Sequence, residues 1–150
     1  MCAQESQTLY NFLRLPVSAH AAALGGDNTT LIEDDASLTF HNPALLSSVS
    51  DKTIGFNFMT YMSGSMAASA SFNRNVGEKI SWAVSGQFIN YGTMRQTDAE
   101  NQQTGDFSAK DIAVSGHISY MLGSRIAGGI AARFITSYIG SYNSLAMGVD

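Results

Sequence analysis

Three histidines and one short acidic run are the residues of this sequence whose types could perform chemistry. His20, His41 and His117 are possible metal ligands or catalytic bases, and Glu33-Asp34-Asp35 is a possible acid–base pair or cation site. The histidines fall on different predicted elements, with no cysteine beside them to complete a metal site. The acidic run lacks the alternating oxygen ligands and the turn glycine of a calcium loop. We therefore expect no metal site, and an acidic run that is either a solvated turn or a partner for arginines elsewhere.

Other motifs of enzymes and of nucleic-acid-binding proteins do not occur in the sequence. It contains no serine nucleophile elbow, no phosphate-binding loop and no dinucleotide fingerprint. The net charge is −4 and there is no basic run, so nucleic acid is not an expected partner. The one cysteine, Cys2, cannot form an internal disulfide. We expect a protein that is not an enzyme and that carries no cofactor.

From Thr53 onward, apolar and small polar residues alternate in runs of about ten, which predicts strands with one apolar face. The opposite face is polar but almost uncharged, because residues 53–73 and 81–94 contain no Lys, Arg, Asp or Glu. A soluble antiparallel sheet would carry charged residues on that face. In the run 111–122, the apolar side carries Ile112, Val114, Ile118, Tyr120 and Leu122, and the other side carries Ala113, Ser115, His117 and Ser119.

This pattern predicts an all-β fold, a transmembrane antiparallel up-and-down β-barrel with apolar residues facing lipid and small polar residues facing the lumen. Runs of about ten residues match the roughly 9–11 that a tilted strand needs to cross a bilayer. Charged residues are 13% of the chain, about half of the roughly 25% in globular proteins. Lipid offers no hydrogen bonds to the backbone, so strands can cross it only as a closed barrel.

The predicted strands cover residues 53–62, 66–73, 80–91, 110–122 and 125–138, and a sixth strand begins at Leu145. Short turns at 73–79 and 123–124 are assigned to the periplasm, which places one long polar loop, Gly92–Ala109, on the outside. We expect residues 51–150 to be the first strands of a larger barrel, with more strands after Asp150 and a signal peptide upstream of the given sequence.

Residues 1–50 lack sustained alternation, which predicts a separate N-terminal periplasmic or plug segment with short helices. Gly25 and Gly26 are expected to end a short helix over residues 19–24. Asn42-Pro43-Ala44 is a second helix start, because the Asn side chain can cap the helix and Pro fits its first position. A segment of this size, leading directly into the first strand, is expected to lie under the barrel or to fill its lumen.

Arg133 is the one charged residue expected in the middle of a strand. The alternation places it on the lumen side, opposite Phe134, and an arginine facing lipid at mid-depth would cost about 2–4 kcal/mol. Its expected partners are carboxylates of the N-terminal segment, Glu33, Asp34 or Asp35. We treat this lumen charge pair as a hypothesis.

The N-terminal residues resemble a known family of outer-membrane proteins. The block from Tyr10 to Ala19, then Ala22-Ala23-Leu24-Gly25-Gly26, an acidic stretch and Asn42-Pro43-Ala44-Leu45-Leu46 are similar to the PorV/PorQ family, especially its PorQ-like members. These are FadL-like barrels of the type IX secretion system of Bacteroidetes. The resemblance covers roughly residues 8–50. It implies an outer-membrane barrel of about fourteen strands, without an enzymatic step, that anchors or presents secretion-attachment components at the cell surface.

Two functions follow from these observations. The first is a scaffold component of the type IX secretion system, with outer-membrane lipid and other secretion components as partners, the latter contacted through the loop 92–109. The second is a FadL-like transporter of hydrophobic solutes, which should have an apolar lumen. The expected inward residues are mainly Ser, Ala, Asn, Gln and Gly, which favours the scaffold. A small soluble ligand-binding barrel would need charged outer faces, which residues 53–73 do not supply.

Overall fold

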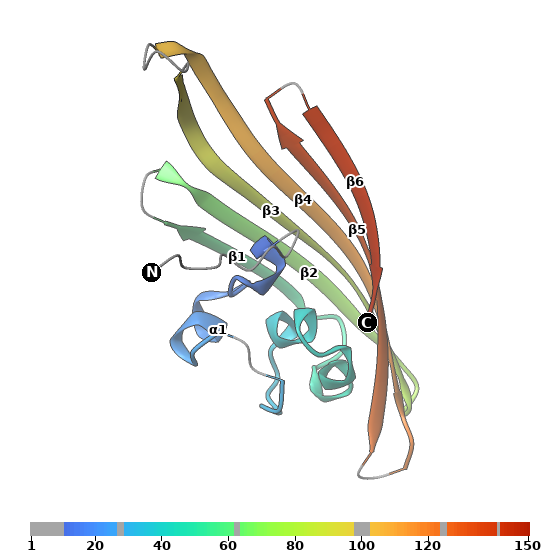
Figure 1. The fold of residues 1–150 in the computed structure, drawn as a ribbon. Coiled ribbons are helices and arrows are strands. Elements are labelled where there is room, and N and C mark those ends of the chain that lie inside the picture. Colours follow the sequence, from blue (N-terminus) through green and yellow to red (C-terminus); the bar gives the residue numbers. More distant parts are fainter. Residues whose placement is uncertain (1–10, 27–28, 62–63, 98–102, 124–125, 141) are drawn as a thin grey trace, which may run out of the picture.

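The computed structural model describes residues 11–26, 29–61, 64–97, 103–123, 126–140 and 142–150 (Figure 1). Cys2 and Tyr10 lie outside these residues. The described part contains a six-stranded antiparallel sheet in which each strand pairs with the next one along the chain, as predicted. The strands are β1 (Ile54–Thr60), β2 (Met66–Val76), β3 (Ile80–Thr97), β4 (Gln103–Met121), β5 (Ala127–Ile139) and β6 (Tyr142–Val149).

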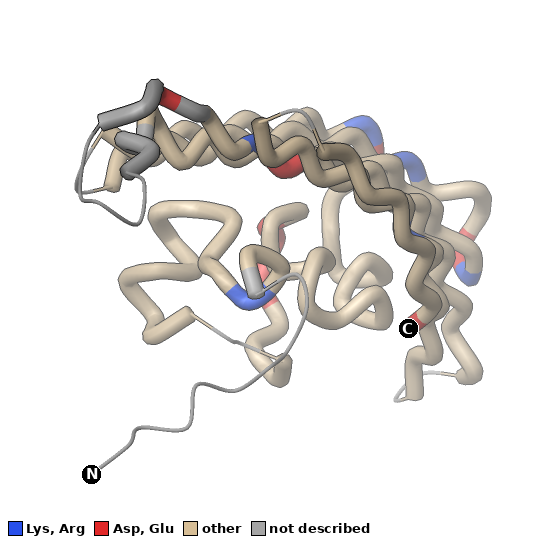
Figure 2. The backbone as a smooth tube through the Cα atoms, turned by 45° about the horizontal axis from the view of Figure 1, so that its top comes forward, with Lys and Arg blue, Asp and Glu red and all other residues tan. Residues whose placement is uncertain are grey.

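The sheet is curved, and residues 11–50, called the N-terminal segment below, lie against its concave face (Figures 1 and 2). Inward and outward residues alternate as the sequence predicts. Ser69 and Ser71 of β2 are buried on the concave side, whereas Phe72 between Ser71 and Asn73 is exposed on the convex side. Arg133 faces the concave side and Phe134 the convex side, as expected from their parity.

The N-terminal segment consists of short helical turns. They are η1 (Asn11–Arg14), α1 (Ala19–Ala23), η2 (Ala36–Phe40) and η3 (Pro43–Ser48). None of the described helices is long and apolar enough to cross a membrane. Their apolar residues bury themselves in three small clusters rather than in one core. The first joins Phe12 to inward residues of four strands, the second joins Leu46 and Val49 to Ala83, and the third lies within the segment around Leu38 and Leu45.

The prediction of one long loop over Gly92–Ala109 is wrong for most of this range. β3 continues to Thr97 and β4 begins at Gln103, so much of this region is a two-stranded ribbon in which Arg95 is the register partner of Asp106. β2 pairs with β3 only as far as Asn90, and β5 pairs with β4 only from Ala109 onward. The sequence of this ribbon is mostly polar, which hides the alternation that a strand of the sheet displays. Gly92 lies at an irregularity in the register, with a φ of 79°.

Within the described residues, β1 and β6 are the two outer strands of the sheet and do not pair with each other. The strands thus form an open, curved sheet with its two edges apart. Each edge strand has one side paired, β1 with β2 and β6 with β5.

Candidate functional site

The concave face holds the backbone of the N-terminal segment through a set of side-chain hydrogen bonds. Each donor is an inward residue of β2, β4 or β5, and each acceptor is a main-chain carbonyl of the segment. The pairs are Ser69 to Val17 (2.8 Å), Asn73 to Ser50 (2.8 Å), Asn75 to Val49 (2.9 Å), Ser119 to Ala44 (3.3 Å) and Arg133 to Phe40. Short helices leave carbonyls without intrahelical partners, and buried carbonyls need a donor. The small polar residues of the inward face supply those donors.

The Asn42-Pro43-Ala44 motif begins η3 as the sequence predicts. Asn42 is the N-cap and its side-chain oxygen accepts a hydrogen bond from the Ala44 amide at 3.0 Å, with Pro43 at the first helical position. The Asn42 amide group also donates to the Thr29 carbonyl at 2.7 Å, so one side chain joins two parts of the segment.

This motif lies directly on Gly129 of β5. A Cβ atom on Gly129 would be 2.5 Å from the carbonyl carbon of Pro43 and 2.9 Å from the Cα atom of Ala44. No side chain fits at this position without displacing backbone. The start of η3 therefore packs directly against the backbone of β5 at Gly129. Ser119, the register partner of Gly129, donates its hydroxyl to the Ala44 carbonyl. The Asn42-Pro43-Ala44 motif therefore packs closely against the concave face of β4 and β5.

Gly25 and Gly26 end α1, as predicted. Both have positive φ angles, 95° and 98°, which favour glycine. Their amides donate to carbonyls of the helix, Gly25 to Ala22 at 3.1 Å and Gly26 to Ala21 at 2.8 Å. The two glycines end the helix, and their role here is conformational.

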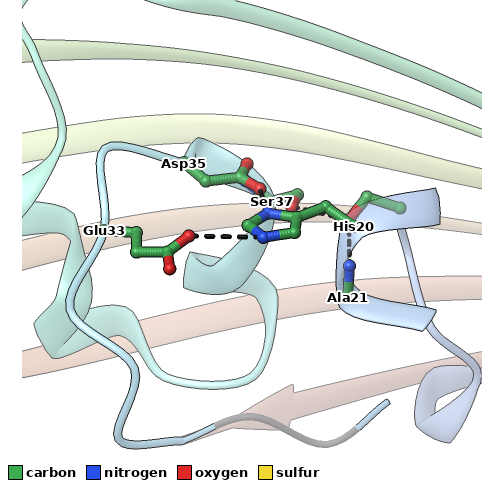
Figure 3. Close-up of polar contacts among 6 residues, drawn as sticks. His20, Ala21, Glu33, Asp35 and Ser37 are labelled. Carbon is green, nitrogen blue, oxygen red and sulfur yellow. Dashed lines mark hydrogen bonds and ion pairs between the residues drawn. The ribbon is translucent and has the colours of Figure 1, made fainter. Parts of the chain in front are cut away.

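The acidic run contacts His20 and Ser50, both within the N-terminal segment. The Nδ1 atom of His20 lies 2.7 Å from a carboxylate oxygen of Asp35, and its Nε2 atom lies 3.3 Å from a carboxylate oxygen of Glu33 (Figure 3). Since a carboxylate can only accept, contacts at both ring nitrogens favour the doubly protonated imidazolium. Asp34 points elsewhere and accepts from the Ser50 amide at 2.6 Å and from the Ser50 hydroxyl.

These contacts set the protonation of the three groups. The hydrogen bond to Asp35, with the negative charges of Glu33 and Asp35, raises the pKa of His20 above its ordinary value against a smaller opposing effect of desolvation. Partial burial works to raise the pKa of Asp35, but the hydrogen bonds from His20 and Ser37 outweigh it and lower that pKa. The hydrogen bonds from Ser50 lower the pKa of Asp34. At neutral pH both aspartates are therefore ionised.

The predicted pairing of Arg133 with Glu33, Asp34 or Asp35 is wrong in its partner. The structure brings Arg133 to the carbonyl of Phe40 in η2 and to the carboxylate of Asp150, whose oxygen lies 2.7 Å from its guanidinium. Arg133 does reach the N-terminal segment, but it binds main chain rather than an acidic side chain. The carboxylates are instead taken by His20 and Ser50, which the sequence pattern did not connect with them.

Two buried polar groups on the inward face make contacts that the sequence did not predict. His117, expected only to face inward, contacts the Ser85 hydroxyl through Nε2 at 2.8 Å and stacks edge-on against Phe40 of η2. Ser85 and His117 are 2% and 1% exposed, so no substrate reaches this pair and it holds structure. Asp111 accepts from Tyr91 at 2.8 Å and from Ser137. The inward parity of Asp111 was the available signal.

The convex face is apolar over most of its area, and Figure 2 shows that most of the length of the strands carries no charged residue. Residues in register across antiparallel strands share a face, so the outward residues form rows across the sheet. The two central rows are Phe58, Ala68, Phe88, Ile112, Thr136, Leu145 and Phe56, Ala70, Gly86, Val114, Phe134, Met147. Phe56 is 78% exposed, an unusual state for a phenylalanine.

Polar and aromatic rows bound this apolar band. The row next to Phe58 and Ile112 contains Met66, Asn90, Lys110, Tyr138 and Asn143. The two rows at the other end contain Arg74, Trp82, Ile118 and Ile130, and Val76, Ile80, Tyr120 and Gly128. Ten residues separate Lys110 from Tyr120 along β4, which is about 33 Å at about 3.3 Å per residue. The band is therefore flanked on both sides by side chains that favour a polar boundary.

Among the described residues, no group of three or more His, Cys, Asp and Glu side chains could hold a metal ion. No family model, curated protein or solved structure matches this chain.

Proposed function

We propose that the sheet is one arc of a transmembrane β-barrel in a bacterial outer membrane, with the N-terminal segment as its plug. The observation that carries this proposal is the exposed apolar band of the convex face between its two polar and aromatic rows. Strands tilted by about 35–45° would give the 33 Å between Lys110 and Tyr120 a height of about 25 Å, the apolar height of outer-membrane barrels. A band of this size facing water would be costly for a soluble protein.

Closure of the barrel is part of the proposal. In lipid, the unpaired amides and carbonyls of β1 and β6 would have no partners, and each would cost several kcal/mol. Strands outside residues 1–150 would therefore pair with both edges, in agreement with the roughly fourteen strands that the PorV/PorQ resemblance implies.

The function that we propose for this barrel is a scaffold component of the type IX secretion system. The resemblance of residues 8–50 to PorQ-like proteins supports it. A second support is that the residues of the resemblance include some that contact the sheet, since Asn42-Pro43-Ala44 packs on Gly129 and Ser119. The motif would thus maintain a plugged barrel that anchors or presents secretion-attachment components at the cell surface.

The alternative, a FadL-like transporter of hydrophobic solutes, finds less support in the concave face. A route for oily solutes needs an apolar lining, whereas the inward residues of β2 and β4 are mainly Ser, Asn, Ala and His. These side chains are also engaged by the N-terminal segment, as with Ser69, Asn73 and Ser119. The N-terminal segment thus occupies the concave face through these hydrogen bonds and through small apolar clusters, such as that of Phe12 with Ile89 and Ile135.

The ribbon formed by residues 92–97 and 103–109 is the proposed contact with other secretion components. It extends beyond the residues where β2 and β5 pair with its strands, so it projects from one end of the sheet (Figure 1). Asp106 is exposed there, and its register partner is Arg95, so a partner would meet a polar surface. A projecting ribbon can change without disturbing the pairing below it.

A deletion strain tests the proposal. Loss of the protein should leave secreted cargo in the periplasm and leave uptake of long-chain fatty acids unchanged. A strain in which residues 93–108 are replaced by a two-residue turn should assemble the barrel at normal level but retain less of the partner complex after membrane extraction. Normal secretion in the deletion strain, together with defective fatty-acid uptake, would establish the transporter instead.

A further inference from the structure

The convex face is hollowed between β1 and β4. The hollow has a volume of about 500 Å³, within the range of about 300–1,000 Å³ of small-molecule sites. Its base is formed by three outward residues with little side chain, Ala68, Ala70 and Gly86, of which Ala70 and Gly86 are register partners of each other. Larger side chains surround this base. They are Phe56 and Phe58 of β1, Phe88 of β3, and Ile112 and Val114 of β4.

The space above Gly86 is open. A Cβ atom built on Gly86 meets no atom within 4 Å. The hollow lies over strands that are paired on both sides, β2 with β1 and β3, and β3 with β2 and β4. It therefore offers no free backbone groups to an added strand. What it offers is a depression between apolar side chains, which suits a chain of methylene groups that gains dispersion contacts on several sides.

A positive charge lies at one end of the hollow. Lys110 is exposed on the same face of β4 as Ile112 and precedes it by two residues, which is about 7 Å along the strand. No described carboxylate forms an ion pair with Lys110. Its register partners are Asn90 and Tyr138. The end of the hollow near Lys110 is thus the end where the apolar band gives way to polar side chains.

We propose that this hollow binds one acyl chain of an anionic phospholipid, whose phosphate pairs with the Lys110 ammonium group. This inference rests on the proposed barrel, because only a chain embedded in a bilayer would present the hollow to lipid. The charge of Lys110 selects an anionic headgroup, and the small residues at Ala68, Ala70 and Gly86 let the acyl chain lie deeper than on the rest of the band.

The test uses the full-length chain in vesicles of equal parts phosphatidylcholine and phosphatidylglycerol. After mild detergent extraction, native mass spectrometry counts the lipids that remain bound. The wild type should retain one phosphatidylglycerol. Gly86→Leu fills the hollow from an open position and should lower retention roughly tenfold. Lys110→Gln should retain phosphatidylcholine and phosphatidylglycerol equally.

A matched control comes from β4. Gly116→Leu also adds a side chain to an outward glycine with nothing within 4 Å, but it fills a different hollow of about 430 Å³ beside Trp82 and Ile130. It should retain phosphatidylglycerol like the wild type. Equal retention in the wild type and Gly86→Leu, or no headgroup preference in the wild type, would overturn the lipid site while leaving the barrel intact. A chain that does not float with the vesicles would overturn both.

Discussion

Gly129 of β5 and Ala44 of η3 lie so close that a methyl group on Gly129 would be 2.9 Å from the Ala44 Cα atom. Gly129 thus joins two parts of the chain that are far apart in sequence, the predicted plug motif and the fifth strand. The contact is between backbones, so only a residue without a side chain permits it. The position of the N-terminal segment on the sheet depends on this absence of a side chain.

Replacing Gly129 with Ala should therefore weaken the packing of η3 against β5. Overpacking of this kind costs about 1–3 kcal/mol, and the neighbouring atoms of Pro43 and Ala44 belong to the backbone, so they cannot rotate aside. Hydrogen exchange of amides 44–49 should become faster by roughly the corresponding factor, while β3 and β4 stay protected. Gly128→Ala is the control, because its added Cβ would meet only the Leu122 Cδ1 atom at 3.7 Å. Equal exchange in both variants would show that η3 does not rest on Gly129.

Removing the Arg133 guanidinium should weaken the contact between η2 and the concave face of the sheet. Arg133→Met leaves the buried Phe40 carbonyl without its donor, which costs about 1–3 kcal/mol. Exchange of amides 36–41 should therefore increase, and Arg133→Lys should restore part of the protection. Arg74→Met removes an exposed arginine from the convex face and should leave these amides unchanged. If the Arg74 variant has the same effect, the change reflects charge rather than the Phe40 contact.

The stability of the N-terminal segment should depend on pH in both directions. The raised pKa of His20 contributes stability below the ordinary value of about 6.5, and this is lost as pH rises through the raised pKa. The lowered pKa values of Asp34 and Asp35 contribute stability above about 3.9, lost as pH falls through them. Protection of amides 19–41, corrected for intrinsic exchange, should therefore be greatest between about pH 4 and 6.5.

His20→Gln separates the two limbs of this profile. Without the imidazole, protection should no longer fall at alkaline pH, while the acidic limb of Asp34 remains because its partner is Ser50. An alkaline loss of the same size in this variant would assign the effect to another group.

The alternation of residues was sufficient to predict the strand order and the facing of residues such as Val114, His117 and Arg133. Side-chain facing is a local property of period two, so it can be read from neighbouring residues. The ribbon at 92–109 was missed because a two-stranded ribbon in water needs no apolar face. A mostly polar sequence of this kind therefore looks like a loop.

The contacts of the N-terminal segment could not be predicted in the same way. Arg133 binds the Phe40 carbonyl, and a main-chain acceptor leaves no trace in residue type. His20 lies in α1 and Asp35 is the N-cap of η2, so their contact depends on the fold of the whole segment. The Asn42 cap was predictable because it involves only residues two apart.

An arginine on the convex face should be far more damaging than one on the concave side. Phe56→Arg places a charge in a central row of the apolar band, which costs about 2–4 kcal/mol in lipid. Asn57→Arg, one residue further on, points to the opposite side, where β1 is only partly covered. Urea unfolding from vesicles measures the difference. Ser85→Arg is a poor control, because Ser85 is buried under the segment and binds His117.

The central claim, that the convex face contacts lipid, is tested most directly by spin-label accessibility along β4. Single cysteines at residues 112–118, in a full-length chain with Cys2 replaced by Ser, carry a nitroxide in vesicles and are probed with oxygen and a water-soluble nickel complex. Collisions with oxygen should alternate with period two, high at Ile112, Val114 and Ile118 and low at Ala113 and Ser115, and collisions with nickel should be rare at the first three. Frequent nickel collisions at Ile112, Val114 and Ile118 would place this face in water and contradict the account.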